Sequence, residues 1–206
     1  MQIAFDIGNV LVHFKLDVFK KEMNDRKLMA ENDVDLFISD AEHLSYIGAS
    51  TLEKQLRLKF PNLTIEDKIA LIEAWNNTIS PNVHMMNFME DLKSEGVKIA
   101  LLSNMGLEHA KHISKKYPEV FAGNICHLSY EIGAFKPTKL FYQSFLLDHE
   151  DFLGCVYLDD LKENIAAGAN FKFKGIHFDL NNYNDASLSI LKKKLREIKT
   201  KVLSGY

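Results

Sequence analysis

The chain has 206 residues and a formal net charge of -3, with 47% of the residues apolar and 26% charged. This composition is typical of a soluble globular protein and offers no basic surface, so we expect no nucleic-acid partner. Because no stretch approaches about 18 consecutive apolar residues and no secretory leader is evident, we expect no membrane partner and a cytoplasmic location, and we leave the oligomeric state open.

The first predicted element is a short buried strand at residues 2–5, which ends on the carboxylate of Asp6. Between residues 14 and 80 the sequence contains no strand-like segment. Amphipathic helices are predicted there instead, at about residues 16–23, 34–41, 52–60 and 65–75. We therefore expect a small helical cap at residues 14–81, inserted into a discontinuous core of residues 1–13 and 82–206.

After the cap, four further apolar segments are separated by helical patterns. Strands are predicted at residues 98–102, 124–128, 154–158 and 175–178, and helices at residues 83–95, 107–116, 139–148 and 162–170. The strand segments are mostly continuously apolar, which is typical of strands covered on both faces in a parallel sheet. Strand followed by helix, repeated, predicts an α/β fold with a Rossmann-like three-layer parallel-sheet core. A lysine-rich helix with a solvated face is predicted at residues 187–201.

The cysteines and two of the histidines have simple structural interpretations. Cys126 and Cys155 each lie in an apolar run, so we expect both to be small core residues. His109 and His112 are one helical turn apart, a spacing that suits a metal. No carboxylate or cysteine falls at a ligand-like offset, so we expect both histidines to face solvent.

Polar side chains follow three of the predicted strands, at the point where each strand ends. They are Asp6, then Ser103 and Asn104, then Asp159 and Asp160. Lys136, in the sequence FKP, follows the predicted strand at residues 124–128 and precedes a predicted helix. Ligands of open parallel sheets bind outside the carboxyl ends of the strands, so these side chains are expected to converge. Carboxylates, a hydroxyl, an amide and an ammonium group together suit phosphate chemistry with a divalent cation.

These elements, in this order, resemble the motifs of the haloacid dehalogenase superfamily. The matching stretches are FDIGNVL at Asp6, LLSN at Ser103, FKP at Lys136 and YLDDLKEN at Asp159 and Asp160. The resemblance spans almost the whole chain, and it is greatest to the subgroup with bacterial α-D-glucose-1-phosphate phosphatase and the phosphatase domain of soluble epoxide hydrolases. It implies a Mg²⁺-dependent phosphatase acting on a small phosphorylated metabolite such as a sugar phosphate.

The resemblance also implies a role for each site residue. Asp6 would be the nucleophile that takes the phosphoryl group. Mg²⁺ would be held by Asp6, by the backbone carbonyl of Gly8 and by Asp160, while Asp159 would either bind the ion or orient it. The phosphoryl oxygens would be bound by Ser103, Lys136 and the backbone N–H groups of Ile7 and Asn104. Asn164 either hydrogen-bonds to the aspartate pair or is a plain exposed helix residue.

Gly8 departs from the family pattern, because most phosphatases of the superfamily carry a second aspartate two residues after the nucleophile. Without that acid the protein is a phosphatase that relies on a good leaving group or another acid, a weakly active phosphate-binding domain, or a dehalogenase. His13, near the mouth of the expected pocket, is either a replacement acid or a simple loop residue. Tyr46 and Ile47 are our candidates for cap residues that contact the substrate.

Overall fold

The computed structural model describes residues 1–28, 31–178 and 189–197. Its main sheet has five parallel strands in the order β5-β4-β1-β6-β7. These are β1 (Gln2–Phe5), β4 (Lys98–Ser103), β5 (Ile125–Leu128), β6 (Val156–Asp159) and β7 (Lys174–His177). The central strand β1 pairs with β4 on one side and β6 on the other, and Phe5 lies opposite both Leu101 and Leu158. The predicted α/β fold with a parallel sheet is confirmed.

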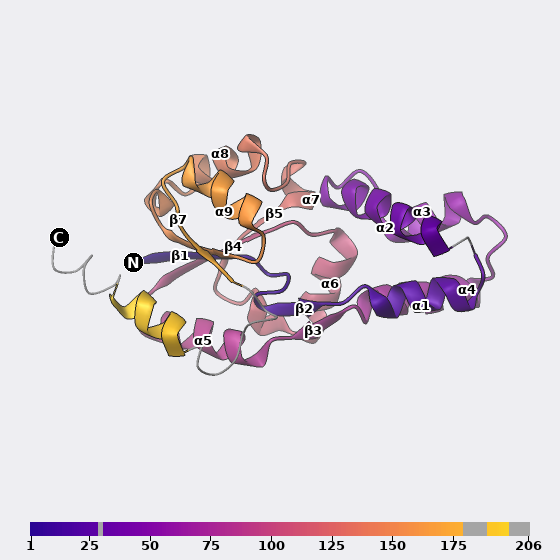
Figure 1. Ribbon diagram of the computed structural model, residues 1–206, viewed down its shortest axis with the longest axis horizontal. Coiled ribbons are helices and arrows are strands. Elements are labelled where there is room, and N and C mark those ends of the chain that lie inside the picture. Colours follow the sequence, from indigo (N-terminus) through magenta and orange to yellow (C-terminus); the bar gives the residue numbers. More distant parts are fainter. Residues whose placement is uncertain (29–30, 179–188, 198–206) are drawn as a thin grey trace.

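The two faces of the sheet carry different sets of buried side chains, because successive residues of a strand point to opposite faces. Ile3 and Phe5 belong to a core shared with α5 (Val83–Ser94), α6 (Leu107–Lys116) and the helical residues 189–197. Ala4 belongs to a second core with α8 (Lys139–Asp148) and α9 (Lys162–Ala169). Figure 1 shows these helices on the two sides of the sheet. The expected three-layer arrangement is therefore present.

Four helices form the cap, which lies at one end of the molecule in Figure 1. They are α1 (Asp17–Asp25), α2 (Glu31–Tyr46), α3 (Leu52–Lys59) and α4 (Ile65–Asn76), close to the predicted ranges. The cap has its own apolar core, which includes Phe19, Leu56 and Trp75. Thr64 and Asp67 form a capping box that starts α4, and Asp67 also pairs with Arg26 after α1. The cap therefore holds together through its own contacts.

An antiparallel two-stranded ribbon joins cap and core, and the sequence did not predict it. Strand β2 (Val12–Phe14) pairs with β3 (Ile79–Pro81), so that His13 lies opposite Ser80. Each strand has three residues, and its partner is more than sixty positions away, so no local periodicity marks it. The ribbon brings the two connections of the cap side by side. The expected domain boundaries fall on it.

Several smaller features complete the chain. A short helix that the sequence did not predict, α7 (Ser129–Ile132), follows β5, and 3₁₀ turns occupy Pro118–Val120 and Glu150–Phe152. The expectation that Cys126 is a core residue is wrong: Cys126 is exposed because β5 is an edge strand, whereas Cys155 is buried as predicted. Of the predicted terminal helix, the stretch before residue 189 and after residue 197 lies outside the described residues.

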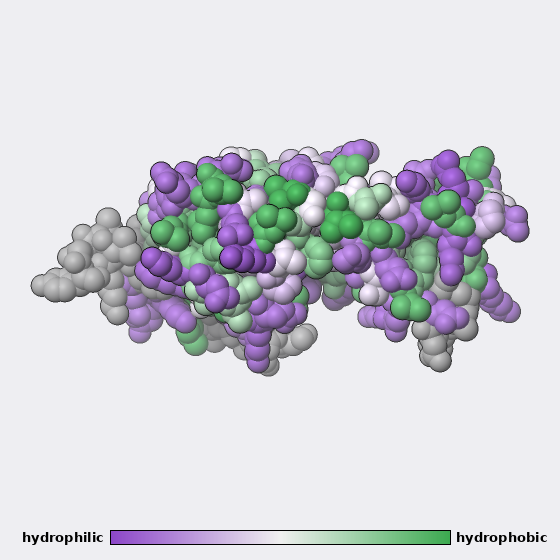
Figure 2. Space-filling view, turned by 90° about the horizontal axis from the view of Figure 1, so that it is seen from above, coloured by the Kyte–Doolittle hydropathy of each residue, from purple (hydrophilic) through white to green (hydrophobic). Residues whose placement is uncertain are grey.

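The outer face over α8 mixes hydrophobic and hydrophilic side chains, as Figure 2 shows. Several leucines, such as Leu140 and Leu147, are exposed there. Among the helices described, none combines the length and the apolar character that crossing a bilayer requires.

Candidate active site

The carboxyl ends of β1, β4 and β6 border a cavity of about 220 Å³. Most of the site residues predicted from the sequence line this cavity together, although up to 154 positions separate them. They are Asp6, Gly8, Ser103, Asn104, Lys136 and Asp160, joined by Asn164 and by Tyr46 from the cap. Ile7 and Asp159 do not line the cavity but lie directly behind it: the Ile7 N–H donates to Oδ1 of Asp6 over 2.7 Å, and Asp159 contacts Lys136.

Lys136 is a buried cation between two carboxylates. Its Nζ lies 3.0 Å from Oδ1 of Asp6 and 2.7 Å from Oδ2 of Asp159, and the residue is only 2% exposed. Burial by itself lowers the pKa of Lys136, but the charges of Asp159 and Asp6 outweigh it and hold the pKa above its usual value. The side chain is therefore an ammonium group at neutral pH, which places a fixed positive charge beside Asp6.

Asp6 lies in an environment with more negative than positive charge. Burial, together with the charges of Asp159 and Asp160, raises its pKa to about 7 against the lowering effect of Lys136. The contacts that described residues make with this carboxylate fall on Oδ1, which accepts from the Ile7 N–H and from Lys136. Oδ2 is therefore available for a ligand. Three carboxylates thus share one ammonium group, and a further cation would relieve the imbalance.

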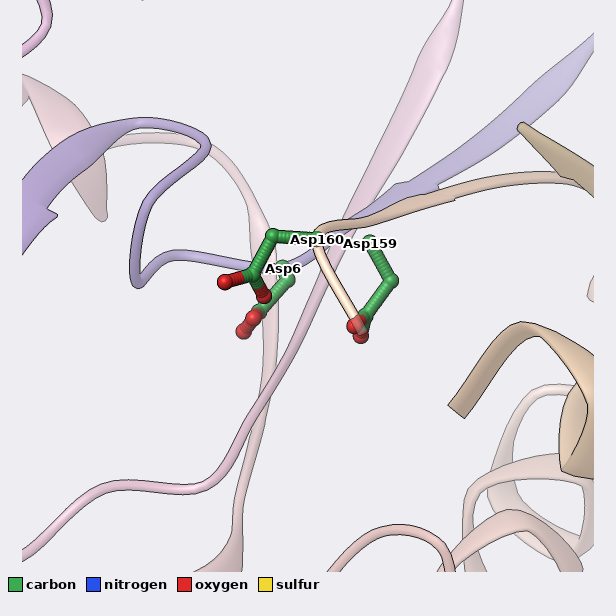
Figure 3. A group of neighbouring side chains, drawn as sticks. All are labelled: Asp6, Asp159 and Asp160. Carbon is green, nitrogen blue, oxygen red and sulfur yellow. The ribbon is translucent and has the colours of Figure 1, made fainter. Parts of the chain in front are cut away.

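Asp159 and Asp160 are adjacent in sequence but differ in their surroundings. Asp159 is fully buried, and its carboxylate accepts four hydrogen bonds. The donors are Lys136 Nζ, the Tyr157 hydroxyl, the Leu161 N–H and Asn164 Nδ2. Asp160 is half-buried and accepts from Asn9 Nδ2 over 3.0 Å. In Figure 3 the carboxylates of Asp6 and Asp160 lie on the same side, and that of Asp159 points away from them.

This donor set fits a hard divalent cation. Asp6, Asp159 and Asp160 each offer one carboxylate oxygen, and the three atoms lie within 4.8 Å of one another. Oxygen ligands from carboxylates and carbonyls are those that Mg²⁺ and Ca²⁺ prefer. Because the oxygens of Asp159 are engaged by four donors, Asp6 and Asp160 are the better placed of the three to bind an ion.

Asn9 and Asn164 hold the carboxylates in place. Asn9 has φ 53° and bridges the loop, since its Oδ1 accepts from the Phe14 N–H over 3.1 Å while its Nδ2 donates to Asp160. Asn164 is 1% exposed, and its Nδ2 donates to Asp159 over 2.9 Å, so of the two interpretations left open for it the hydrogen bond is the one observed. Gly8 directly precedes Asn9 in the same loop. A Cβ atom added at Gly8 would meet nothing within 4 Å.

The cap reaches the cavity at the end of α2, where two glycines allow a close approach. A Cβ atom at Gly48 would lie 2.4 Å from the carbonyl oxygen of Tyr130, and one at Gly106 would lie 2.8 Å from Cβ of Ser45. These contacts fix the position of Tyr46, which lines the cavity beside Glu42. Burial raises the pKa of Tyr46 well above its usual value, so its hydroxyl keeps its proton.

The histidines near the site behave differently from expectation. His109 was expected to face solvent, but it is buried and stacks on Trp75 with the ring centroids 4.7 Å apart. Its Nε2 lies 3.2 Å from the Trp75 carbonyl oxygen, and burial lowers its pKa to about 4. The cap supplies this cover, which the sequence of α6 alone does not show. His112 is partly buried, and His13 is not among the described residues that line the cavity.

Sequence reasoning missed two contacts that position this site. The side-chain amide of Asn104 binds the backbone of Lys136 on both sides, through Oδ1 and Nδ2. Tyr157 donates its hydroxyl proton to Asp159. The second contact had a signal in the sequence, because residues two apart on a strand face the same side. The first had none, since the partner of Asn104 is 32 positions away.

Solved structures share this architecture. No protein-family model and no curated protein sequence matches the chain. A HAD family enzyme from Bacteroides thetaiotaomicron superposes with a TM-score of 0.78 at 16% identity, covering 91% of this chain and 97% of that one. The wild-type form of that enzyme, in complex with magnesium and inorganic phosphate, gives a TM-score of 0.76 at 16% identity, covering 91% and 98%.

Two further structures extend the comparison. A predicted HAD-like family hydrolase from Porphyromonas gingivalis has a TM-score of 0.69 at 16% identity, with 92% of this chain and 96% of that one covered. An L-2-haloacid dehalogenase from Xanthobacter autotrophicus has a TM-score of 0.60 at 11% identity, with 91% and 80% covered. The fold of this chain is therefore that of the haloacid dehalogenase-like hydrolases, as the motif resemblance predicted.

Proposed function

We propose that this protein is a haloacid dehalogenase-like hydrolase that acts as a Mg²⁺-dependent phosphatase on a small phosphorylated metabolite, through an aspartyl-phosphate intermediate on Asp6. The observation that carries the proposal is the placement of Lys136 Nζ 3.0 Å from Asp6, at the cavity that Asp160 and Ser103 also line. Phosphoryl transfer depends mainly on positioning and on cations that neutralise the charge of the phosphate. The magnesium and phosphate complex of the structurally similar Bacteroides enzyme supports the same assignment.

Asp6, Asp160 and the backbone carbonyl of Gly8 would hold Mg²⁺. When bound, the ion would supply positive charge that screens the repulsion between the Asp6 carboxylate and the phosphate. The dense hydrogen bonding of Asp159 supports a different role for that residue. It would keep Lys136 charged and in place beside Asp6.

The reaction would begin when Oδ2 of Asp6 attacks phosphorus, forming a new P–O bond as the bond from phosphorus to the ester oxygen breaks. The ester oxygen leaves with the bond's electron pair and takes a proton from water or from another acid. Water then attacks phosphorus and loses a proton, and the P–O bond to Asp6 breaks. This releases inorganic phosphate and restores the carboxylate. The Ile7 N–H, bonded to Oδ1, would aim the other oxygen of Asp6 at phosphorus.

Three groups at the cavity would bind the phosphoryl oxygens: the Ser103 hydroxyl, the Lys136 ammonium group and the backbone N–H of Asn104. Ser103 and Asn104 stand at the carboxyl end of β4, just before α6, where the start of a helix favours anions. Preorganised donors of this kind stabilise the charge that develops in the transition state.

A second function has one observation in its favour. Position 8 carries glycine where an acid would protonate the leaving oxygen, a contribution typically worth about 10²–10⁴ in rate. A domain that binds phosphate and metal without fast turnover would have no need of that acid. Against this alternative, the cavity keeps the nucleophile, the ammonium group and two further carboxylates together. A dehalogenase is less favoured, because it would have no use for a cation site.

The test is phosphate release from sugar, nucleotide, aryl and acyl phosphates, with MgCl₂ and after its removal with EDTA. The proposal predicts turnover that requires both Mg²⁺ and Asp6. Asp6→Asn should abolish release, whereas Asp148→Asn, at an exposed aspartate of α8, should not change it. Release that survives Asp6→Asn would contradict the proposal. Phosphate binding without release from any ester would favour the binding domain.

A further inference from the structure

Much of the lining of the cavity is apolar. Apart from Leu161, which follows the aspartate pair, five apolar side chains line it, and we call them the apolar wall: Val12 and Phe14 from β2, Ile79 from β3, Met105 after β4 and Ile113 from α6. Among the described residues that line the cavity, the charged ones are Asp6, Asp160 and Lys136. All three belong to the part that would bind the ion and the phosphoryl group. The part left for the rest of the substrate therefore offers apolar contacts and no charge.

Beyond the residues assigned to the ion, the phosphoryl group and their support, the polar side chains that line the cavity are His109 and Tyr46, and neither carries a charge. His109 is neutral, because burial lowers its pKa to about 4, and its Nε2 lies 3.2 Å from the Trp75 carbonyl oxygen. The Tyr46 side chain lies beside Glu42. A sugar placed against this wall would lose the hydrogen bonds of its hydroxyl groups to water without full replacement. Apolar pockets with few polar groups select ligands of matching character.

The volume limits the size of the substrate. A cavity of about 150 Å³ lined by apolar side chains is large enough to hold benzene. The cavity here measures about 220 Å³, which leaves room for a phosphoryl group and one ring. Gly8 points to the same kind of substrate by an independent route. A phenol or an enol leaves as a stabilised anion, so the acid that is missing at position 8 is needed least for such a leaving group.

We infer that the substrate is a phosphate monoester of a compact, apolar and acidic hydroxyl compound, such as a phenol or an enol, held against the apolar wall. This inference rests on the proposed phosphatase function and differs from the sugar phosphate that the sequence suggested. Four of the five side chains of the apolar wall come from the β2–β3 ribbon and α6, two elements that the family motifs do not include, and Met105 directly follows the LLSN motif.

Binding of phosphonates tests the apolar wall without any turnover. With Mg²⁺ present, we expect the Kd of phenylphosphonate to be at least about tenfold lower than that of methylphosphonate, measured by calorimetry. Val12→Thr keeps the shape of the side chain but adds a hydroxyl group at the wall. It should weaken phenylphosphonate binding about fivefold or more and leave methylphosphonate binding unchanged.

Val10→Thr is the matched control, since Val10 lies two residues before Val12 and is equally buried but does not line the cavity. It should change neither Kd. Ile79→Thr repeats the test from the facing strand in case Val12→Thr does not fold. Equal Kd values for the two phosphonates in the wild-type protein would overturn the inference.

Rates of ester hydrolysis distinguish a failure of this substrate inference from a failure of the proposed phosphatase function. We expect kcat/KM with Mg²⁺ to be at least about tenfold higher for phenyl phosphate than for glucose 1-phosphate. Equal or faster hydrolysis of glucose 1-phosphate would overturn the inference but leave the phosphatase function standing. If no ester is hydrolysed, the phosphatase function fails, and the phosphonate Kd values alone decide whether the cavity selects apolar ligands.

Discussion

The side-chain amide of Asn104 binds the backbone of Lys136 at two points. Its Oδ1 accepts from the Lys136 N–H over 2.7 Å, and its Nδ2 donates to the Lys136 carbonyl oxygen over 2.8 Å. Asn104 stands at the end of β4, while Lys136 belongs to a loop between two helices. The paired bonds therefore fix the loop to the sheet. They also fix the position of the Lys136 backbone, from which its side chain reaches Asp6.

Asn104→Ala should therefore lower both stability and turnover. The buried N–H of Lys136 would lose its partner, which costs about 1–3 kcal/mol in the free energy of unfolding. The ammonium group would lose its fixed position, so we expect kcat to fall about tenfold or more with a smaller change in KM. Urea denaturation and steady-state kinetics measure the two effects. Asn87→Ala, at an exposed position of α5, is the control, and an unchanged kcat in Asn104→Ala would contradict the positioning role.

Asp159 and Asp160 should respond differently to the same substitution. Asp159→Asn removes a buried charge that pairs with Lys136, so we expect the free energy of unfolding to fall by about 3–5 kcal/mol. Asp160→Asn removes a half-buried carboxylate whose described donor is Asn9, so we expect little loss of stability and Mg²⁺ binding weakened by about 100-fold. Urea denaturation without metal and calorimetric titration with MgCl₂ separate the two effects. The opposite order of Mg²⁺ affinities would make Asp159 the ligand.

The convergence of the site could be predicted from the sequence because it depends on the ends of strands. Asp6, Ser103 and Asp160 each follow an apolar run, and a parallel sheet brings such ends to one edge. Lys136 could be placed there less directly, because it lies between a predicted strand and a predicted helix, and the structure inserts α7 between β5 and Lys136. The strands themselves could be predicted because burial on both faces leaves a continuous apolar run.

The rest of the site depends on contacts between distant segments, for which the sequence has no local signal. The apolar wall uses Val12 and Ile79, which come together only through the ribbon. His109 is buried only because Trp75 of the cap covers it. Cys126 has the apolar neighbours of a core residue, but its strand is at the edge of the sheet.

The buried His109 should make the protein less stable in mild acid. The folded protein holds the pKa of His109 at about 4, below the ordinary value of 6.5, because burial disfavours the charged ring. Between these two pH values the unfolded chain binds a proton that the folded protein excludes. The stability that the neutral ring contributes is thus complete above pH 6.5 and is lost as the pH falls toward 4.

This contribution can be isolated with a variant that keeps the stack on Trp75. In the wild-type protein we expect it to make the free energy of unfolding about 2 kcal/mol lower at pH 5 than at pH 7. His109→Phe should remove this part of the pH dependence, and His84→Gln, at an exposed histidine, should keep it. Urea denaturation at the two pH values gives the comparison. The same pH dependence in His109→Phe as in the wild-type protein would show that His109 is not its source.

Contact between cap and core should depend on Gly48 more than on an otherwise similar glycine. Gly48 and Gly96 both have left-handed backbones, with φ +68° and +77°, so alanine at either site costs about 1 kcal/mol. Only at Gly48 would the added Cβ meet the Tyr130 carbonyl oxygen. Gly48→Ala should therefore destabilise the protein by more than Gly96→Ala and lower kcat/KM by moving Tyr46. Urea denaturation and kinetics of both variants test this. Equal effects would show that the cap can move away from Tyr130 without loss of stability or activity.

Restoring an acid at position 8 should raise turnover where the leaving group is poor. A Cβ atom at Gly8 would meet nothing within 4 Å, and the residue lines the cavity beside Asp6, so an aspartate side chain has room there. A positioned general acid is typically worth about 10²–10⁴ in rate, and more for an alcohol than for a phenol. We therefore expect Gly8→Asp to raise kcat on cyclohexyl phosphate by at least about 100-fold and to change kcat on phenyl phosphate much less. Gly8→Asn has the same shape without the acid and should give neither gain. Equal gains on both esters, or a gain with asparagine, would mean that the side chain acts by filling space, since only proton transfer depends on the basicity of the leaving oxygen.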